Sequence, residues 1–281
     1  MSESSESIYS EWLDEYCAQN SDPFVLGSHE MISSCLDLEK DIPNEYGWKY
    51  SSEQSFKVQI SKAVGCQEMN SVYWTDMARN LEAYSLMTLW RGLELIRSCL
   101  NGLNKRETIS PAIAARSLLE LSTVFLLNAN SLEGLFAKLK FKKDTITTST
   151  DAESLIVKMI WGTRYNNPEP HLLQTNIMTA LQKLAKSPGA ENLMKVYEFL
   201  CDIAHPSYIG NTSYWSHIQE TYPDESEHRV ISRLLDRVVN VEILDKTIWA
   251  LAWSSFCIRS SFLMISLANK NLLAELSKNE K

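Results

Sequence analysis

The sequence predicts an all-α protein, an irregular multi-helix bundle with long central helices. Only 9 Gly and 8 Pro occur among 281 residues, whereas turn-rich β folds need these residues at short intervals. Hydrophobic residues make up 44% of the chain and charged residues 22%, the balance of a globular protein with a sizeable core. Several segments also repeat their apolar residues at helical spacing over lengths that strands do not reach.

The two clearest helices are predicted at residues 71–103 and 110–129. Apolar residues form one stripe along the first, and Gly102 marks its end. Ser110 and Pro111 provide the N-cap and the first helical position of the second. A helix that spans residues 71–103 is long enough to form the central element of a bundle.

Further helices are predicted along the rest of the chain. The central layer is completed by helices at 189–204 and 240–268, while residues 1–70 form an N-terminal tail and irregular helical segment before the main bundle domain of residues 71–281. Shorter helices are expected at 131–141, 151–162 and 174–186. Residues 227–277 are interpreted as one or two long helices with an apolar band formed by Ile231, Leu234, Leu235, Val238, Val241 and Ile243.

The net charge and the cysteines limit which partners and which cell compartment the sequence favours. A net charge of −8 disfavours non-specific binding to nucleic acid or to an anionic membrane. The 6 cysteines form no CxxC pair and the first residues do not resemble a signal peptide, which favours the cytoplasm. Motifs for nucleotides, zinc proteases, calcium and serine hydrolases are absent, so no cofactor and no metal is predicted.

One apolar stretch, residues 248–268, has the length of a membrane span. Arg259 lies at its middle, and five serines lower its apolarity. We therefore expect a buried core helix, and no membrane partner is favoured.

Two helices carry polar residues that are expected to converge. Arg116 and Glu120 lie four residues apart in an apolar helix, where charges must be paired. Tyr197, Cys201 and His205 repeat every four residues on another helix, and His205 reaches its broken end. Arg116, Glu120, Tyr197 and His205 are thus predicted to form a polar pocket that is structural or binds a small anion. A metal site at Glu198, Asp202 and His205 is disfavoured, because no second histidine lies nearby.

Two other features offer alternatives. Arg164 is followed after six residues by His171, a spacing that matches the Arg-x(4–6)-His motif of HEPN-type ribonucleases, in which arginine contacts phosphate and histidine transfers a proton. A lysine run is interpreted as a helix end exposed to solvent, or as a place where RNA could dock; its members are Lys138, Lys140, Lys142 and Lys143.

The segments 115–127 and 197–211 resemble segments of uncharacterised bacterial all-helical proteins that are loosely HEPN-like. The resemblance covers about a third of the chain and falls on Arg116, Glu120, Tyr197, His205 and Pro206. It implies a bacterial, cytoplasmic helical domain with a role in stress response or phage defence, but no defined activity. No histidine follows Arg116 at the HEPN spacing.

The sequence therefore predicts a cytoplasmic accessory or binding domain with a protein partner or a homo-oligomeric state. The alternative is a metal-independent HEPN-type ribonuclease or toxin that uses Arg164 and His171 as catalytic residues.

Overall fold

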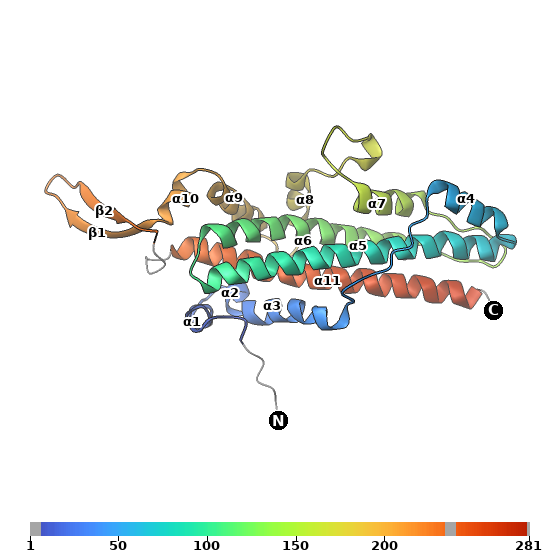
Figure 1. Cartoon of the computed structure of the whole chain (residues 1–281), viewed down its shortest axis with the longest axis horizontal. Helices are drawn as coiled ribbons and strands as arrows, with labels where there is room; N and C mark the ends of the chain where they lie inside the picture. Colours follow the sequence, from blue (N-terminus) through green and yellow to red (C-terminus); the bar gives the residue numbers. More distant parts are fainter. Residues whose placement is uncertain (1–6, 234–239, 280–281) are drawn as a thin grey trace, which may run out of the picture. The chain divides into compact units, whose positions relative to one another are not determined.

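The computed structural model describes residues 7–233 and 240–279 and is mainly helical (Figure 1). Its elements confirm the predicted all-α class with long central helices. Within the described residues they are α1 (Glu11–Ala18), α2 (Pro23–Leu26), α3 (Ser28–Leu36), η1 (Asp37–Asp41), α4 (Glu53–Lys62), α5 (Gly65–Asn104), α6 (Ile109–Phe136), α7 (Thr150–Trp161), η2 (Pro170–Leu172), α8 (Ile177–Leu184), α9 (Leu193–Ala204), α10 (Tyr208–Thr212), β1 (Trp215–Thr221), β2 (Glu227–Ile231) and α11 (Val241–Asn279).

The turn from α5 into α6 departs from its expected form. Gly102 does not end α5, which continues to Asn104. A Cβ at residue 102 would lie 2.9 Å from the Pro111 ring, so glycine is needed there for close packing rather than for helix termination. The turn itself uses Arg106, with a φ of 57°, and a bond from the Glu107 amide to the Gly102 carbonyl at 2.9 Å.

The chain folds into two compact units. One comprises residues 1–38, 91–123 and 181–257, and the other comprises residues 39–90, 124–180 and 258–281. Each of the three long helices, α5, α6 and α11, therefore contributes one part to each unit. A domain boundary at residue 70 stays a prediction of the sequence, although residue 70 itself lies inside α5.

Aromatic packing and polar ties hold the first unit together. Trp249 and Trp253 of α11 stack with their ring centroids 6.0 Å apart, and both are buried. The start of α11 is tied to the N-terminal helices because Asp245 accepts hydrogen bonds from Tyr16 at 2.5 Å and Asn20 at 2.8 Å.

A small hairpin, β1–β2, was not predicted. Its two strands pair antiparallel, and the turn between them contains Glu225 at a φ of 65°. The expected helix from residue 227 is therefore wrong over 227–231, and Ile231 is 73% exposed rather than part of an apolar band. Val241 is also exposed while Ile243 is buried in α11. The expected band members Leu234, Leu235 and Val238 lie outside the described residues.

Two helices within the described residues, α6 and α11, are long and apolar enough to cross a bilayer by length and composition alone. In the most apolar window of α11, 67% of the residues are buried inside the protein. Such burial is what a core helix needs, and it supports the interpretation of residues 248–268 as a core segment. Whether the protein meets a membrane stays a prediction.

Candidate functional site

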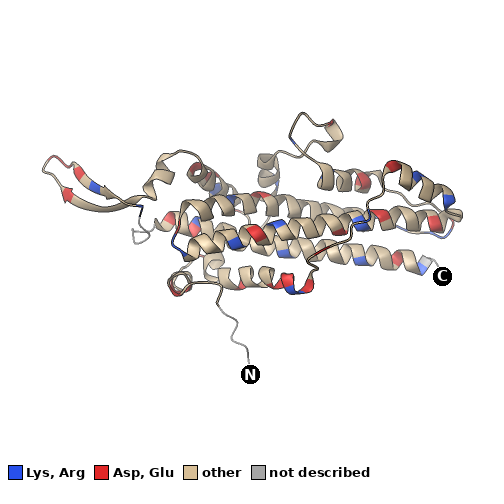
Figure 2. Cartoon of the chain, in the orientation of Figure 1, with Lys and Arg blue, Asp and Glu red and all other residues tan. Residues whose placement is uncertain are grey.

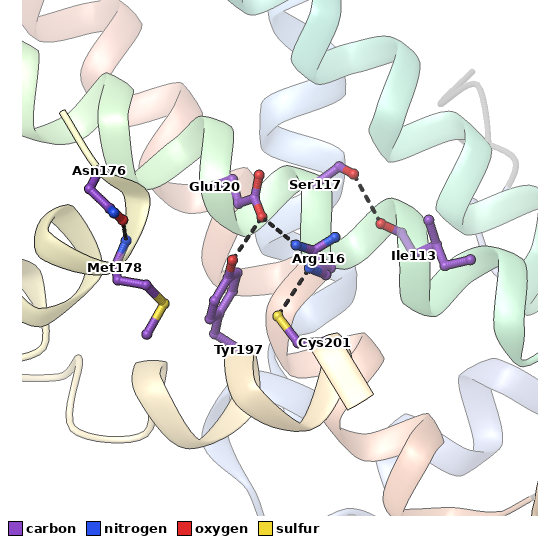
Figure 3. Close-up of polar contacts among 8 residues, drawn as sticks. All are labelled: Ile113, Arg116, Ser117, Glu120, Asn176, Met178, Tyr197 and Cys201. Atoms are coloured by element: carbon purple, nitrogen blue, oxygen red, sulfur yellow. Dashed lines mark hydrogen bonds and ion pairs between the residues drawn. The ribbon is translucent and has the colours of Figure 1, made fainter. Parts of the chain in front are cut away.

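Arg116, Glu120, Tyr197 and Cys201 form one bonded cluster in the first unit (Figure 3). The Arg116 Nη2 lies 3.1 Å from Glu120 Oε1, and its Nε donates to Cys201 Sγ at 3.1 Å. The Tyr197 hydroxyl donates to the same Glu120 oxygen at 2.9 Å. The guanidinium carbon also lies 5.7 Å from the centre of the Tyr197 ring, within the range of a cation–π contact.

The positions of these side chains follow from helical spacing on two elements. Arg116 and Glu120 are one turn apart on α6, and Tyr197 and Cys201 are one turn apart on α9. The side chains of Arg116 and Glu120 are 29% and 35% exposed, so the cluster lies at the edge of the packed α6–α9 contact rather than deep within it. The predicted convergence of Arg116, Glu120 and Tyr197 is present in the structure.

The protonation states of Tyr197 and Arg116 favour the hydrogen bonds of the cluster. Burial, with bonds to Cys201 and Glu120, raises the pKa of Tyr197 despite the opposing effect of Arg116. Burial acts to lower the pKa of Arg116, but the contacts with Cys201, Tyr197 and Glu120 raise it overall. At neutral pH the phenol is therefore a proton donor and the guanidinium is charged. Neither group can serve as a general base.

The prediction that His205 joins this cluster is wrong. His205 is exposed. Among the residues that the structure describes, its ring makes no hydrogen bond or ion pair. The cause is Pro206, because a residue before proline avoids the helical region, and His205 indeed takes φ −97° and ψ 157°. The spacing of four residues along α9 therefore stops at Cys201.

The loop after α9 is held by Ser207 rather than by the histidine. The Ser207 hydroxyl donates to the Asp202 carbonyl at 2.7 Å and accepts from the Gly210 amide at 3.2 Å. It therefore caps α10 and ties it to the end of α9.

Arg164 and His171 both lie in the exposed loop between α7 and α8. The Arg164 Nη1 donates to the Gln174 carbonyl at 3.0 Å, and the His171 Nδ1 lies 3.4 Å from a carboxylate oxygen of Glu169. Within residues 7–233 and 240–279 neither of the two side chains bonds to the other. The structure therefore does not assemble them into one catalytic pair. Their assignment as catalytic residues stays a prediction.

No metal centre is apparent in the part of the chain that the structure describes, where no group of three or more His, Cys, Asp or Glu side chains is arranged to hold an ion. The residues weighed for a metal, Glu198, Asp202 and His205, do not form such a group.

The segment after α6 differs from the predicted helix at 131–141, because α6 ends at Phe136. Residues 137–149, which we call the lysine segment, run irregularly and are anchored to α5. Asn70 Nδ2 donates to the Thr145 carbonyl at 2.9 Å, and the Thr147 amide donates to Asn70 Oδ1 at 2.7 Å. The Trp74 indole donates to the Thr147 carbonyl at 2.8 Å. Asn70 and Trp74 are both buried.

A cleft of about 580 Å³ opens in the second unit between the end of α6, the lysine segment and α11. We call it the α6–α11 cleft. The wall of the cleft is mainly apolar. Two of its rings, Phe136 and Phe141, pack edge-on against Trp74, with ring centroids 6.0 and 5.8 Å from that of Trp74. The lining residues are Glu133, Phe136, Ala137, Leu139, Lys140, Phe141, Met264, Leu267, Ala268, Asn271, Leu272 and Glu275.

The α6–α11 cleft could not be predicted from the sequence, because its walls come from segments more than a hundred residues apart. One local signal was present, since Phe141 interrupts a run of lysines that solvation alone would explain. The chain thus has a bonded, partly exposed polar cluster in one unit and an open, mainly apolar cleft in the other. Comparison with protein-family models, with curated proteins and with solved structures gives no match for this chain.

Proposed function

We propose that this protein is a non-catalytic helical binding domain of the cytoplasm that takes an apolar or amphiphilic small molecule into the α6–α11 cleft. The observation that carries the proposal is the cleft itself, with its volume of about 580 Å³ and its mainly apolar wall. Small-molecule sites are typically concave, mostly apolar and roughly 300–1,000 Å³ in volume. A cleft of this kind is the default location for a ligand.

The polar cluster on α6 and α9 supports a structural role there rather than catalysis or anion binding. Glu120 already accepts from Arg116 and Tyr197, and Arg116 is held by Glu120 and Cys201. An incoming anion would compete with the Glu120 carboxylate for the same guanidinium. We therefore assign the cluster the task of fixing α9 on α6, which is the structural alternative for the predicted pocket.

The HEPN-like resemblance supports a bacterial origin and a role in stress response or phage defence, and these assignments are proposed on that ground alone. A ribonuclease function draws no support from the geometry of Arg164 and His171, because each side chain is bonded within its own loop. An accessory domain that binds a ligand is consistent with a structural polar cluster in the first unit and an apolar cleft in the second.

An environment-sensitive apolar dye tests the proposal. Ala268 lines the cleft, and Ala268→Phe should fill part of it, whereas Ala274 is exposed on the same helix outside the cleft and provides the matched control Ala274→Phe. We expect the full chain to bind 1-anilinonaphthalene-8-sulfonate under native conditions. Ala268→Phe should weaken that binding at least about tenfold, while Ala274→Phe leaves it unchanged. Equal dye binding by both variants, at equal thermal stability, would show that the cleft is not the site.

A further inference from the structure

We propose that the ligand of the α6–α11 cleft is a single-chain anionic amphiphile, such as a long-chain carboxylate or a monoacyl phosphate. Its chain would lie along the apolar wall and its head group beside Lys140. This inference rests on the proposed binding function and adds the chemical class of the ligand. Three features of the second unit carry it: the shape of the apolar wall, the local charge and the anchoring of the lysine segment.

The apolar wall suits an unbranched chain. Leu272 is only 5% exposed and forms part of the wall, while Met264 and Leu139 are half-buried beside it. Leu267 remains 59% exposed at the edge, so the apolar surface continues outwards from the cleft. Burial of methylene groups on this surface would supply most of the affinity.

The two segments that form the cleft carry a net charge opposite to that of the whole chain. Acidic residues, red in Figure 2, occur on elements such as α1 and the hairpin, and the chain carries −8 overall. The two segments that supply the walls of the cleft, residues 133–144 and 264–278, nevertheless hold six lysines and three carboxylates, and of these Lys140, Glu133 and Glu275 line the cleft itself. Of these carboxylates Glu275 is already bonded to Lys278 at 2.6 Å. The six lysines are Lys138, Lys140, Lys142, Lys143, Lys270 and Lys278.

The lysine segment is held in place by buried residues of α5 rather than left free. Asn70 bonds the backbone at Thr145 and Thr147, and Trp74 supports both the backbone at Thr147 and the ring of Phe141. An irregular segment anchored in this way presents Lys140 and Phe141 in a fixed geometry, which lowers the entropic cost of binding. Fixed loops on a rigid scaffold are a common place for ligand contacts.

This combination favours an amphiphile over RNA. RNA would contact the lysines through phosphates and would stack bases on exposed rings, but it has no use for an aliphatic wall. A cationic or neutral chain would match the wall and not the lysines. An anionic chain matches both.

Calorimetric titration of the full chain below the micelle concentration of each ligand tests the inference. The probes are dodecanoate, dodecyl phosphate, dodecanol and dodecylamine, with decanoate to measure the dependence on chain length. We expect both anions to bind at least about tenfold more tightly than the amine, with the preference reduced at high salt. Shortening the chain should cost up to about fourfold for each methylene removed. The two anions distinguish a carboxylate from a phosphate as the preferred head group.

Charge reversal locates the head group. Lys140→Glu should abolish the preference for anions while dodecanol binding persists, whereas Lys186→Glu, which changes the net charge equally at an exposed site in the other unit, should have no effect. Equal binding of anion, alcohol and amine would overturn the inference while leaving the apolar site and the proposed function intact. Absence of binding by any chain, together with failed dye binding, would overturn both.

Other occupants of the cleft would also contradict the inference, and each has its own signature. Self-association that Ala268→Phe abolishes, measured by light scattering, would assign the cleft to a second copy of the chain. Binding of RNA that Lys140→Glu removes would assign the lysine segment to a polyanion. Binding to anionic vesicles without binding of monomeric dodecanoate would assign the surface to a membrane.

Discussion

Arg116 illustrates how a charged residue is accommodated in an apolar helix. Its guanidinium has a carboxylate one turn away on α6 and a sulfur atom and an aromatic face on α9. The pairing with Glu120 and the approach of Tyr197 could be predicted from spacing and from the cost of an unpaired charge. The contact with Cys201 was missed because a neutral thiol gives no charge signal in a sequence.

Arg116→Ala should lower the free energy of unfolding by about 1–3 kcal/mol, because Glu120 then keeps only the Tyr197 hydroxyl as a partner. Tyr197→Phe should cost about 0.5–1.5 kcal/mol through the loss of one hydrogen bond. Urea unfolding followed by circular dichroism measures both values.

The exposed His205 provides the control for these variants. His205→Ala should change the unfolding free energy by less than about 0.5 kcal/mol. A loss of stability as large as that of Arg116→Ala would mean that the imidazole supports the cluster after all. It would restore the four-residue pocket predicted from the sequence.

Tyr46 and Tyr73 of the second unit predict that the folded protein loses stability at alkaline pH. Burial and a bond to Glu82 raise the pKa of Tyr46 to about 12, and burial with the nearby Glu153 raises the pKa of Tyr73 to about 12, against an ordinary value of 10.0. Since the folded pKa exceeds the unfolded one, the stabilisation is complete below pH 10 and is lost as the pH rises towards about 12. We expect the melting temperature to fall across this window, with a smaller decline in Tyr73→Phe. An unchanged decline in that variant would contradict the assignment.

At the scale of elements, helix interiors could be predicted from apolar periodicity, whereas several helix ends could not. The helices at 71–103, 110–129 and 151–162 correspond to α5, α6 and α7 with shifts at their ends. The helix predicted at 110–129 continues to Phe136, and the helix predicted at 131–141 does not form as a separate element. Beyond Phe136, buried Asn70 and Trp74 bind the backbone and compete with helix formation. Such long-range bonds leave no periodic signal.

The hairpin was missed for a different reason. Both of its strands are largely exposed, so β1–β2 lacks the alternation that marks a half-buried strand. The sequence Tyr222-Pro223-Asp224 before the turn residue Glu225 was the available clue.

Removal of the Asn70 side chain should release the lysine segment. Asn70→Ala leaves the amide of Thr147 and the carbonyl of Thr145 without their partner, at a cost of about 1–3 kcal/mol. We expect faster amide exchange across residues 137–149 and weaker ligand binding. Asn101→Ala, at an exposed position of the same helix, should change neither. Unchanged exchange in Asn70→Ala would show that the segment is held in another way.

At the scale of the whole molecule, the sequence could predict the helical class but not the location of a site. The predicted pocket used residues close in sequence on two helices, and three of its four members meet. The α6–α11 cleft depends on how segments around residues 136 and 268 pack together, which composition and spacing do not determine.

The chain of 281 residues is expected to be inactive as a ribonuclease. Purified protein incubated with total RNA in EDTA should produce no more cleavage than His171→Ala, because Arg164 and His171 are bonded to separate groups of their loop. Cleavage that survives EDTA and disappears in His171→Ala would replace the binding function with the HEPN-type alternative.

The most direct measurement is a methionine-methyl NMR titration of the full chain with dodecanoate. Met264 lines the α6–α11 cleft, whereas Met31 and Met194 belong to the other unit. We expect the Met264 methyl resonance to shift in a saturable way while those of Met31 and Met194 stay unchanged. A Met264 signal that does not respond at dodecanoate concentrations that saturate the chain would contradict binding in the cleft.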